Sequence, residues 1–201
     1  MSAVNVQKQG VIFAVMAYVM WGLAPMYFKL IDSIPAAEIL LQRIIWSFVF
    51  ITIVIAVINK WASVREVLVK PKLVLMLFGT ALILALNWGL FIWAVTNDRI
   101  LDASLGYYIN PLLNVLFGGL FLGERLKKWQ GIAVGLAFLA VMIQVLSFGS
   151  FPVVSVCLAT SFSLYGLFRK QMKAVDSLTG LLLESAMMVP IAIGYWIFFA
   201  D

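Results

Sequence analysis

Seven apolar runs alternate with short polar segments along the chain, at approximately residues 11–30, 37–58, 73–96, 103–122, 130–148, 151–169 and 178–199. Each run is about 18–24 residues long, which is the length that a helix needs to cross the hydrocarbon core of a bilayer. The connections are short, except for a basic loop at residues 59–72. Because short connections make consecutive helices antiparallel neighbours, the pattern predicts an all-α integral membrane protein, a polytopic bundle of seven transmembrane helices.

The composition indicates a bilayer environment and excludes some kinds of metal site and cross-link. Of the 201 residues, 64% are hydrophobic and 11% are charged, whereas soluble domains are about 45–50% apolar and about 25% charged. There is no histidine, and Cys157 is the one cysteine, which excludes a His/Cys metal site and a disulfide framework. We therefore expect no metal and no cofactor.

The distribution of lysine and arginine predicts how the chain is oriented. Eleven of these 14 residues lie in the N-terminal segment and in the loops after the second, fourth and sixth runs: Lys8; Lys60, Arg65, Lys70, Lys72; Arg125, Lys127, Lys128; Arg169, Lys170 and Lys173. Since cytoplasmic loops are enriched in positive charge, the N-terminus is expected in the cytoplasm of a multi-pass inner-membrane protein. Basic residues confined to short loops do not indicate a nucleic-acid partner.

The run between Asp102 and Glu124 contains polar residues on one helical face. Tyr107, Asn110 and Asn114 are spaced by three, four and seven residues, so they share that face. Lipid cannot satisfy two carboxamides and a phenol. The face is expected to border a solute pathway; the alternative is a packing helix whose polar groups bond to neighbouring helices.

Three other apolar runs also contain polar or charged side chains that are costly to bury in lipid. Arg43 lies several residues into the second run, and Glu184 lies two turns into the seventh. A charge at bilayer depth is expensive and favours a cavity or a partner; for Arg43 the alternative is snorkelling to the outer interface. Glu184 is a candidate for proton coupling or cation binding, or for a static salt bridge with Arg43. Asn87 and Trp88 interrupt the third run and complete the candidate substrate-binding set.

Two small-residue motifs predict a tightly packed hairpin. Gly119 and Gly123 have the spacing that allows two membrane helices to approach closely, and so do Gly131 and Gly135. We expect the helices on either side of the connection at 124–128 to pack through these glycines.

A weak internal repeat relates the first and sixth runs. Trp21 and Tyr165 each precede a glycine, and each is followed in the next run by an ionisable residue, Arg43 or Glu184. The spacing implies a unit of five helices, so the second copy would be inverted relative to the first, as in many secondary transporters. The expected domains are a first five-helix repeat at 1–148 and the first two helices of a second, inverted repeat at 149–201. Two full copies need ten helices, so we expect the chain to be truncated.

The most specific segments resemble a known family: WGLAPMYFK, ILLQRIIWS, NWGLFIWAV, DASLGYYINPLLNVLFGGLFLGERL and YGLFRK. They resemble the RarD permeases, of the chloramphenicol-resistance-permease type, in the EamA branch of the drug/metabolite transporter superfamily. The resemblance implies ten helices in two inverted five-helix repeats, cytoplasmic termini and alternating-access transport of a small solute.

The sequence thus predicts an inner-membrane secondary transporter and not an enzyme. The expected partners are membrane lipid, a small-molecule solute and, in a homodimer, a second copy of the chain. One alternative is a non-functional fragment, and another is a seven-helix membrane receptor without transport activity. The candidate substrate-binding residues are Asn87, Trp88, Tyr107, Asn110, Asn114, Arg43 and Glu184.

Overall fold

The computed structural model describes the backbone of residues 3–147 and 151–199, and within these ranges every regular element is an α-helix. The described helices are α1 (Ala3–Leu30), α2 (Ala36–Val57), α3 (Trp61–Leu68), α4 (Pro71–Thr96), α5 (Ile100–Leu122), α6 (Lys128–Ser147), α7 (Val153–Gln171) and α8 (Ser177–Phe199). The predicted helical bundle is confirmed.

Six of the helices in the described part of the chain are long and apolar enough to cross a membrane: α1, α2, α4, α5, α6 and α8. The predicted span at 151–169, the sixth in chain order, forms the helix α7, but α7 is not among these six helices. The reason lies in its composition. Hydroxyl side chains interrupt its apolar sequence and two cations occupy its last turn: Ser155, Thr160, Ser161, Ser163, Arg169 and Lys170.

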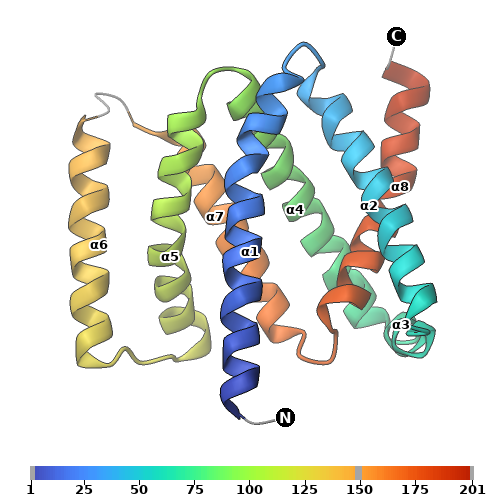
Figure 1. Ribbon diagram of the computed structural model, residues 1–201, viewed down its shortest axis with the longest axis horizontal. Helices are drawn as coiled ribbons and strands as arrows, with labels where there is room; N and C mark the ends of the chain where they lie inside the picture. The colour runs from blue at the N-terminus through green and yellow to red at the C-terminus, as the bar shows by residue number, and fades with distance from the viewer. Residues whose placement is uncertain (1–2, 148–150, 200–201) are drawn as a thin grey trace.

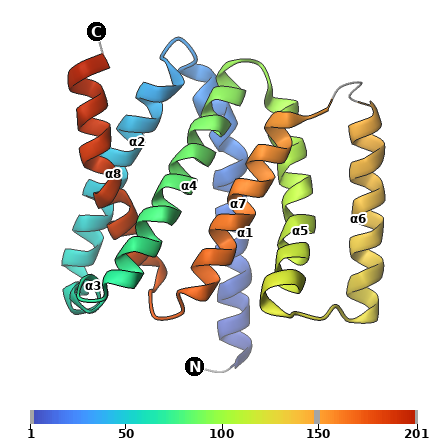
Figure 2. The ribbon, with the colours of Figure 1, turned by 180° about the vertical axis from the view of Figure 1, so that it is seen from behind.

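The helices pack around α4 and α7. α7 lies between α4 and α5, which is clearest in Figure 2, and α8 packs against α2 and α4. α1 crosses α4 on the opposite face from α7 (Figure 1), while α6 packs on α5 at one edge. Most side chains of α1 and α6 face outward, as expected for helices that contact lipid.

The two ends of the bundle differ in charge. The start of α1, α3, the α5–α6 connection and the α7–α8 turn lie at one end, here called the basic end (Figure 1). These segments carry the lysine and arginine clusters noted in the sequence. The α1–α2 and α4–α5 turns lie at the other end, here called the turn end.

The segment at 59–72 is not simply a loop, as the sequence suggested, because it contains α3. This helix has only eight residues, yet Val64 and Val67 are buried, at 5% and 3% exposure. They join an apolar cluster with Ile51, Leu77 and Met172. Apolar residues three apart lie on one helical face, so α3 is an amphipathic helix that covers the basic end of α2, α4 and α8.

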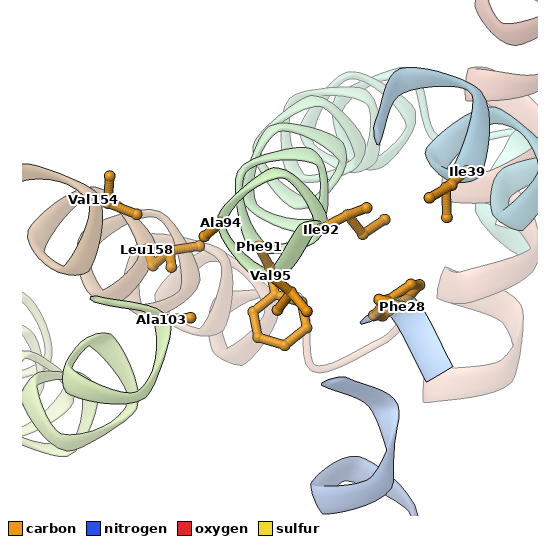
Figure 3. Packing of buried hydrophobic residues seen from close by; sticks show 9 residues of the cluster. All are labelled: Phe28, Ile39, Phe91, Ile92, Ala94, Val95, Ala103, Val154 and Leu158. Atoms are coloured by element: carbon orange, nitrogen blue, oxygen red, sulfur yellow. The ribbon is translucent and has the colours of Figure 1, made fainter. Parts of the chain in front are cut away.

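A second apolar cluster joins five helices near the turn end. α4 contributes Phe91, Ile92, Ala94 and Val95 at its centre, and side chains from α1, α2, α5 and α7 surround them (Figure 3). Ile92 and Ala94 have no exposed surface. This cluster fixes α4 as the central helix of the fold.

The predicted glycine-packed hairpin is wrong. A β-carbon built on Gly131 or Gly135 meets nothing within 4 Å. Gly123 ends α5 with a left-handed backbone, at φ 67°, which is the usual role of a glycine after a helix. The glycine spacing is present and α6 packs on α5, but no atom of either helix approaches the other at these glycines.

The close helix approach occurs instead at Gly106. A β-carbon there would lie 3.0 Å from the backbone oxygen of Ser155 and 3.2 Å from the β-carbon of Leu158. Small residues let membrane helices come together, and Gly106 does this for α5 and α7.

Candidate functional site

Arg43 lies against two tryptophans within the bundle. Its guanidinium carbon is 3.5 Å from the centroid of the Trp88 ring and 5.9 Å from that of Trp21. A guanidinium stacked on an indole is stabilised by the ring quadrupole, more strongly away from water. The structure thus brings two of the predicted site residues, Arg43 and Trp88, into direct contact.

Three further rings adjoin this pair. Trp21 stacks on Phe91 with 6.3 Å between centroids, and Tyr107 meets both rings edge-on, at 6.4 and 5.8 Å. Tyr107 is 41% exposed, so it also borders open space. We call Arg43, Trp88, Trp21 and Tyr107 the aromatic–arginine cluster.

The four members of this cluster come from four helices but lie at similar depths. Counted along α1, α2, α4 and α5 from the turn end, they lie roughly 10–14 Å in, at 1.5 Å per residue. A hydrocarbon core is about 30 Å thick. The cluster is therefore below the interface and above the midplane, on the side of the turn end.

Two grooves flank α1 and reach this cluster. One, of about 630 Å³, runs between α1 and α2 and is lined by Arg43, Trp46 and Ser47 among others. The other, of about 720 Å³, runs between α1, α4 and α5 and is lined by Trp21 and Tyr107. Each is large enough for a small organic solute.

The predicted site asparagines bond mainly to α7. Asn87 donates from Nδ2 to the carbonyl of Leu158 at 2.9 Å and to Ser161 Oγ at 2.8 Å. Asn110 donates in the same way to the carbonyl of Ala159 at 3.2 Å and to Ser163 Oγ at 3.0 Å. The amides of α4 and α5 thus hold the polar face of α7.

Asn114 continues this row towards the basic end. Its Nδ2 donates to Asn110 Oδ1 at 2.9 Å, and its side chain is exposed. Across the same interface, Ser155 Oγ donates to the carbonyl of Asp102 at 2.7 Å. Ser155, Ser161 and Ser163 of α7 therefore have partners on α4 and α5.

Glu184 lies in a separate buried site. It is 3% exposed, and its carboxylate accepts a hydrogen bond from Thr80 Oγ1 at 2.7 Å and one from the Tyr165 hydroxyl at 3.3 Å. The guanidinium of Arg169 is close enough to act electrostatically on this carboxylate. One side chain from α4 and two from α7 therefore surround the acidic group of α8.

The predicted salt bridge between Arg43 and Glu184 does not form. None of the ion pairs among the described residues includes either side chain. Each residue is the eighth of its helix, counted from Ala36 or from Ser177, but α2 and α8 start at opposite ends of the bundle. The two charges therefore lie at different depths and have different partners.

Ion pairs join the connecting segments at both ends. At the turn end, Lys29 Nζ lies 2.8 Å from Asp32 and 2.8 Å from Asp98. At the basic end, Lys60 Nζ lies 2.9 Å from Asp176. Burial raises the pKa of Asp176, but hydrogen bonds from Lys60 and Thr179 lower it by more, so that the pKa is about 2.

Sequence reasoning did not place three of these groups in a site. Trp21 was noted only as part of the repeat, and Tyr165 likewise; Thr80 was not singled out. The sequence could have indicated a role for Trp21, because it lies on the face of α1 that also carries Phe28. No sequence pattern indicates a role for Thr80, since a lone threonine in an apolar run usually bonds within its own helix. In the described residues, no group of three or more His, Cys, Asp or Glu side chains could hold a metal ion.

Comparison with known proteins places the chain in a family. Residues 8–146 match the EamA-like transporter family. An uncharacterized transporter of Vibrio cholerae is 51% identical over 194 residues, which is 96% of this chain and 64% of that protein. The protein RarD of Escherichia coli is 45% identical, over 96% of this chain and 65% of its own length. The chloramphenicol-sensitive protein RarD of Pseudomonas aeruginosa is 31% identical, over 96% and 66%.

The chain thus spans just under two thirds of the length of these relatives. No solved structure matches it. Its relatives are membrane transporters rather than enzymes, and a multi-pass bundle of this kind fits a bacterial inner membrane. The resemblance to the RarD permeases is confirmed, and the chain belongs to the EamA-like transporter family.

Proposed function

We propose that this protein moves a small solute across the bacterial inner membrane by alternating access, with its N-terminus in the cytoplasm. The observation that carries the proposal is the aromatic–arginine cluster, which combines a cation and three aromatic side chains at bilayer depth beside two open grooves. Costly polar groups at that depth are retained where they border a solute path. The basic end would face the cytoplasm, in keeping with the charge of its loops.

The directions of the helices support an inverted repeat of 1–148 and 149–201. α1 runs from the basic end to the turn end, while α7 runs the opposite way (Figures 1 and 2). α2 and α8, the next helix of each unit, are also antiparallel and pack against each other. A pseudo-twofold axis between such units is typical of alternating-access transporters. In this arrangement α7 is the sixth of seven spans, with its polar face against α4 and α5.

Among these residues we assign two roles, contact with the solute and positioning of other groups. Arg43, Trp21 and Tyr107 line the grooves and contact the solute, whereas Trp88 positions the guanidinium of Arg43. The carboxamides of Asn87 and Asn110 hold α7 in place, because their donors already bond to its carbonyl and hydroxyl groups.

Cysteine labelling tests whether the α1–α2 groove is an aqueous path. In a background carrying Cys157→Ser, we would compare Ser47→Cys, which lines the groove, with Val49→Cys, which is two residues further along α2 and lines no described groove. An impermeant maleimide reacts with a thiolate in water and not with a thiol in lipid. We expect it to label position 47 alone, and from one side of the membrane.

Solute protection then tests transport. A panel of small metabolites, together with chloramphenicol because one relative is named chloramphenicol-sensitive, would be added before labelling. A transported solute should slow labelling at position 47 and accumulate in proteoliposomes. Equal labelling of both positions, or of neither, would contradict a pathway through this groove.

A further inference from the structure

Among the described residues Arg43 contacts the rings of Trp21 and Trp88 and lies near Tyr107, and none of the ion pairs there includes it. One face of its guanidinium is covered by Trp88 at 3.5 Å, and its N–H donors lie in the guanidinium plane, so they point sideways rather than at the ring. Trp88 does not supply a donor to the groove, since its indole Nε1 is buried, without a partner in the described structure, and its side chain lines a small separate cavity. The donors that face the groove are therefore those of Arg43.

The acidic groups nearby do not neutralise this cation. Glu184 already accepts from Thr80 and Tyr165. Glu38 lines the same groove as Arg43, but it is five residues earlier on α2, or about 7.5 Å along the helix towards the turn end. Inside the bilayer, Arg43 is therefore a stacked positive charge without a counter-ion from the described chain.

We propose that the solute is an organic anion, a carboxylate attached to an aromatic or apolar body, and that Arg43 binds its carboxylate. This rests on the proposed function and names the class of its substrate. A guanidinium binds a carboxylate through two parallel hydrogen bonds, and the stack on Trp88 fixes the plane in which both form. The rest of the groove suits the body of the solute, since Tyr27, Phe28, Trp46 and Phe50 line it.

A small series of ligands that differ in charge tests whether binding requires a carboxylate, without altering the protein. The purified 201-residue chain in detergent would be titrated calorimetrically with 3-phenylpropionate, its neutral amide 3-phenylpropionamide, the cation 3-phenylpropylamine, and phenylalanine. We expect the acid to bind about tenfold or more tightly than the amide, the gain typical of hydrogen bonds between charged groups. The amine should bind more weakly than both.

Variants then assign the preference to Arg43. Arg43→Gln should abolish the difference between acid and amide, and Arg43→Lys should keep part of it, because lysine retains the charge but not the bidentate geometry. Trp88→Leu should weaken binding of the acid several-fold by removing the aromatic ring against which the guanidinium lies. Arg125→Gln removes the same charge from the exposed α5–α6 connection and should leave the difference unchanged.

Several results would overturn the proposal that the solute is an organic anion. These are tighter or equal binding of the amide or the amine, tighter binding of phenylalanine than of 3-phenylpropionate, no binding of the acid, or an acid preference that survives in Arg43→Gln. Maleimide labelling at position 47 measures whether the groove is open to water, and this measurement does not depend on the charge of a ligand. If a neutral or cationic solute protects position 47 from labelling, the proposed pathway through the groove stands and the proposed anionic substrate is ruled out.

Discussion

Replacing Gly106 by alanine adds one methyl group at the crossing of α5 and α7. The new β-carbon would lie 3.0 Å from the backbone oxygen of Ser155 and 3.2 Å from the β-carbon of Leu158. The first neighbour is main chain, so it cannot move by rotating a side chain. Relief requires a shift of α7, which would stretch the 2.7 Å bond from Ser155 Oγ to the carbonyl of Asp102.

Two opposing contributions set the change in the free energy of unfolding. Overpacking a well-packed contact costs about 1–3 kcal/mol. Alanine is favoured over glycine within a helix by about 1 kcal/mol, which offsets part of that cost. Gly119→Ala provides the matched control on the same helix, because its β-carbon would be 3.7 Å from its nearest neighbour, an ordinary contact. The helix-propensity gain is common to both variants, so their difference isolates the packing term.

The measurement is reversible unfolding in mixed micelles with increasing dodecyl sulfate, followed by far-ultraviolet circular dichroism. We expect Gly106→Ala to be less stable than Gly119→Ala by about 1–3 kcal/mol in the free energy of unfolding. A difference below about 0.5 kcal/mol, the usual scatter of uncoupled surface substitutions, would refute the close approach of α5 and α7 at this glycine.

Three further outcomes can be checked in the same way. Thr80→Val removes a donor to the buried carboxylate of α8 and should cost about 1 kcal/mol more than Thr52→Val, whose hydroxyl bonds only within its own helix; equal costs would contradict this. Asn110→Leu should lower stability by about 1 kcal/mol, as interhelical bonds in membranes do, and a thermal melt that matches the unmodified chain would refute the α7 contact. The lowered pKa of Asp176 stabilises the fold above the ordinary aspartate pKa, near 4, and this contribution is lost as the pH falls towards 2. The stability difference between the native chain and Asp176→Asn should therefore be constant above about pH 5 and shrink below about pH 4; a difference that grows on acidification would reverse the assigned sign.

The sequence predicted the helices well because hydropathy and helix length are local properties. Six of the predicted runs correspond to helices that can span a membrane. Polar residues in the other run, α7, weakened its hydropathy, and the helix is stabilised by contacts that no local pattern contains. α3 was missed because eight residues within a basic segment give little signal, although the spacing of Val64 and Val67 indicated a buried face.

The partners of the polar side chains could not be predicted in the same way. Whether Asn110 faces water or a serine depends on which helix lies opposite, and α7 is about fifty residues away in the chain. Arg43 and Glu184 hold the same position along their helices, each being the eighth residue, but α2 and α8 start at opposite ends of the bundle. Equivalence in sequence was therefore no guide to contact in space.

The hydroxyl-rich composition of α7 has a consequence for biogenesis. Translocon-mediated insertion favours segments that are soluble in lipid by themselves, and α7 is the least suited of the long helices to enter in that way. Its hydrogen-bonding partners on α4 and α5 emerge from the ribosome first, because they precede it in the chain. The order of synthesis thus supplies a prepared surface before this helix reaches the membrane.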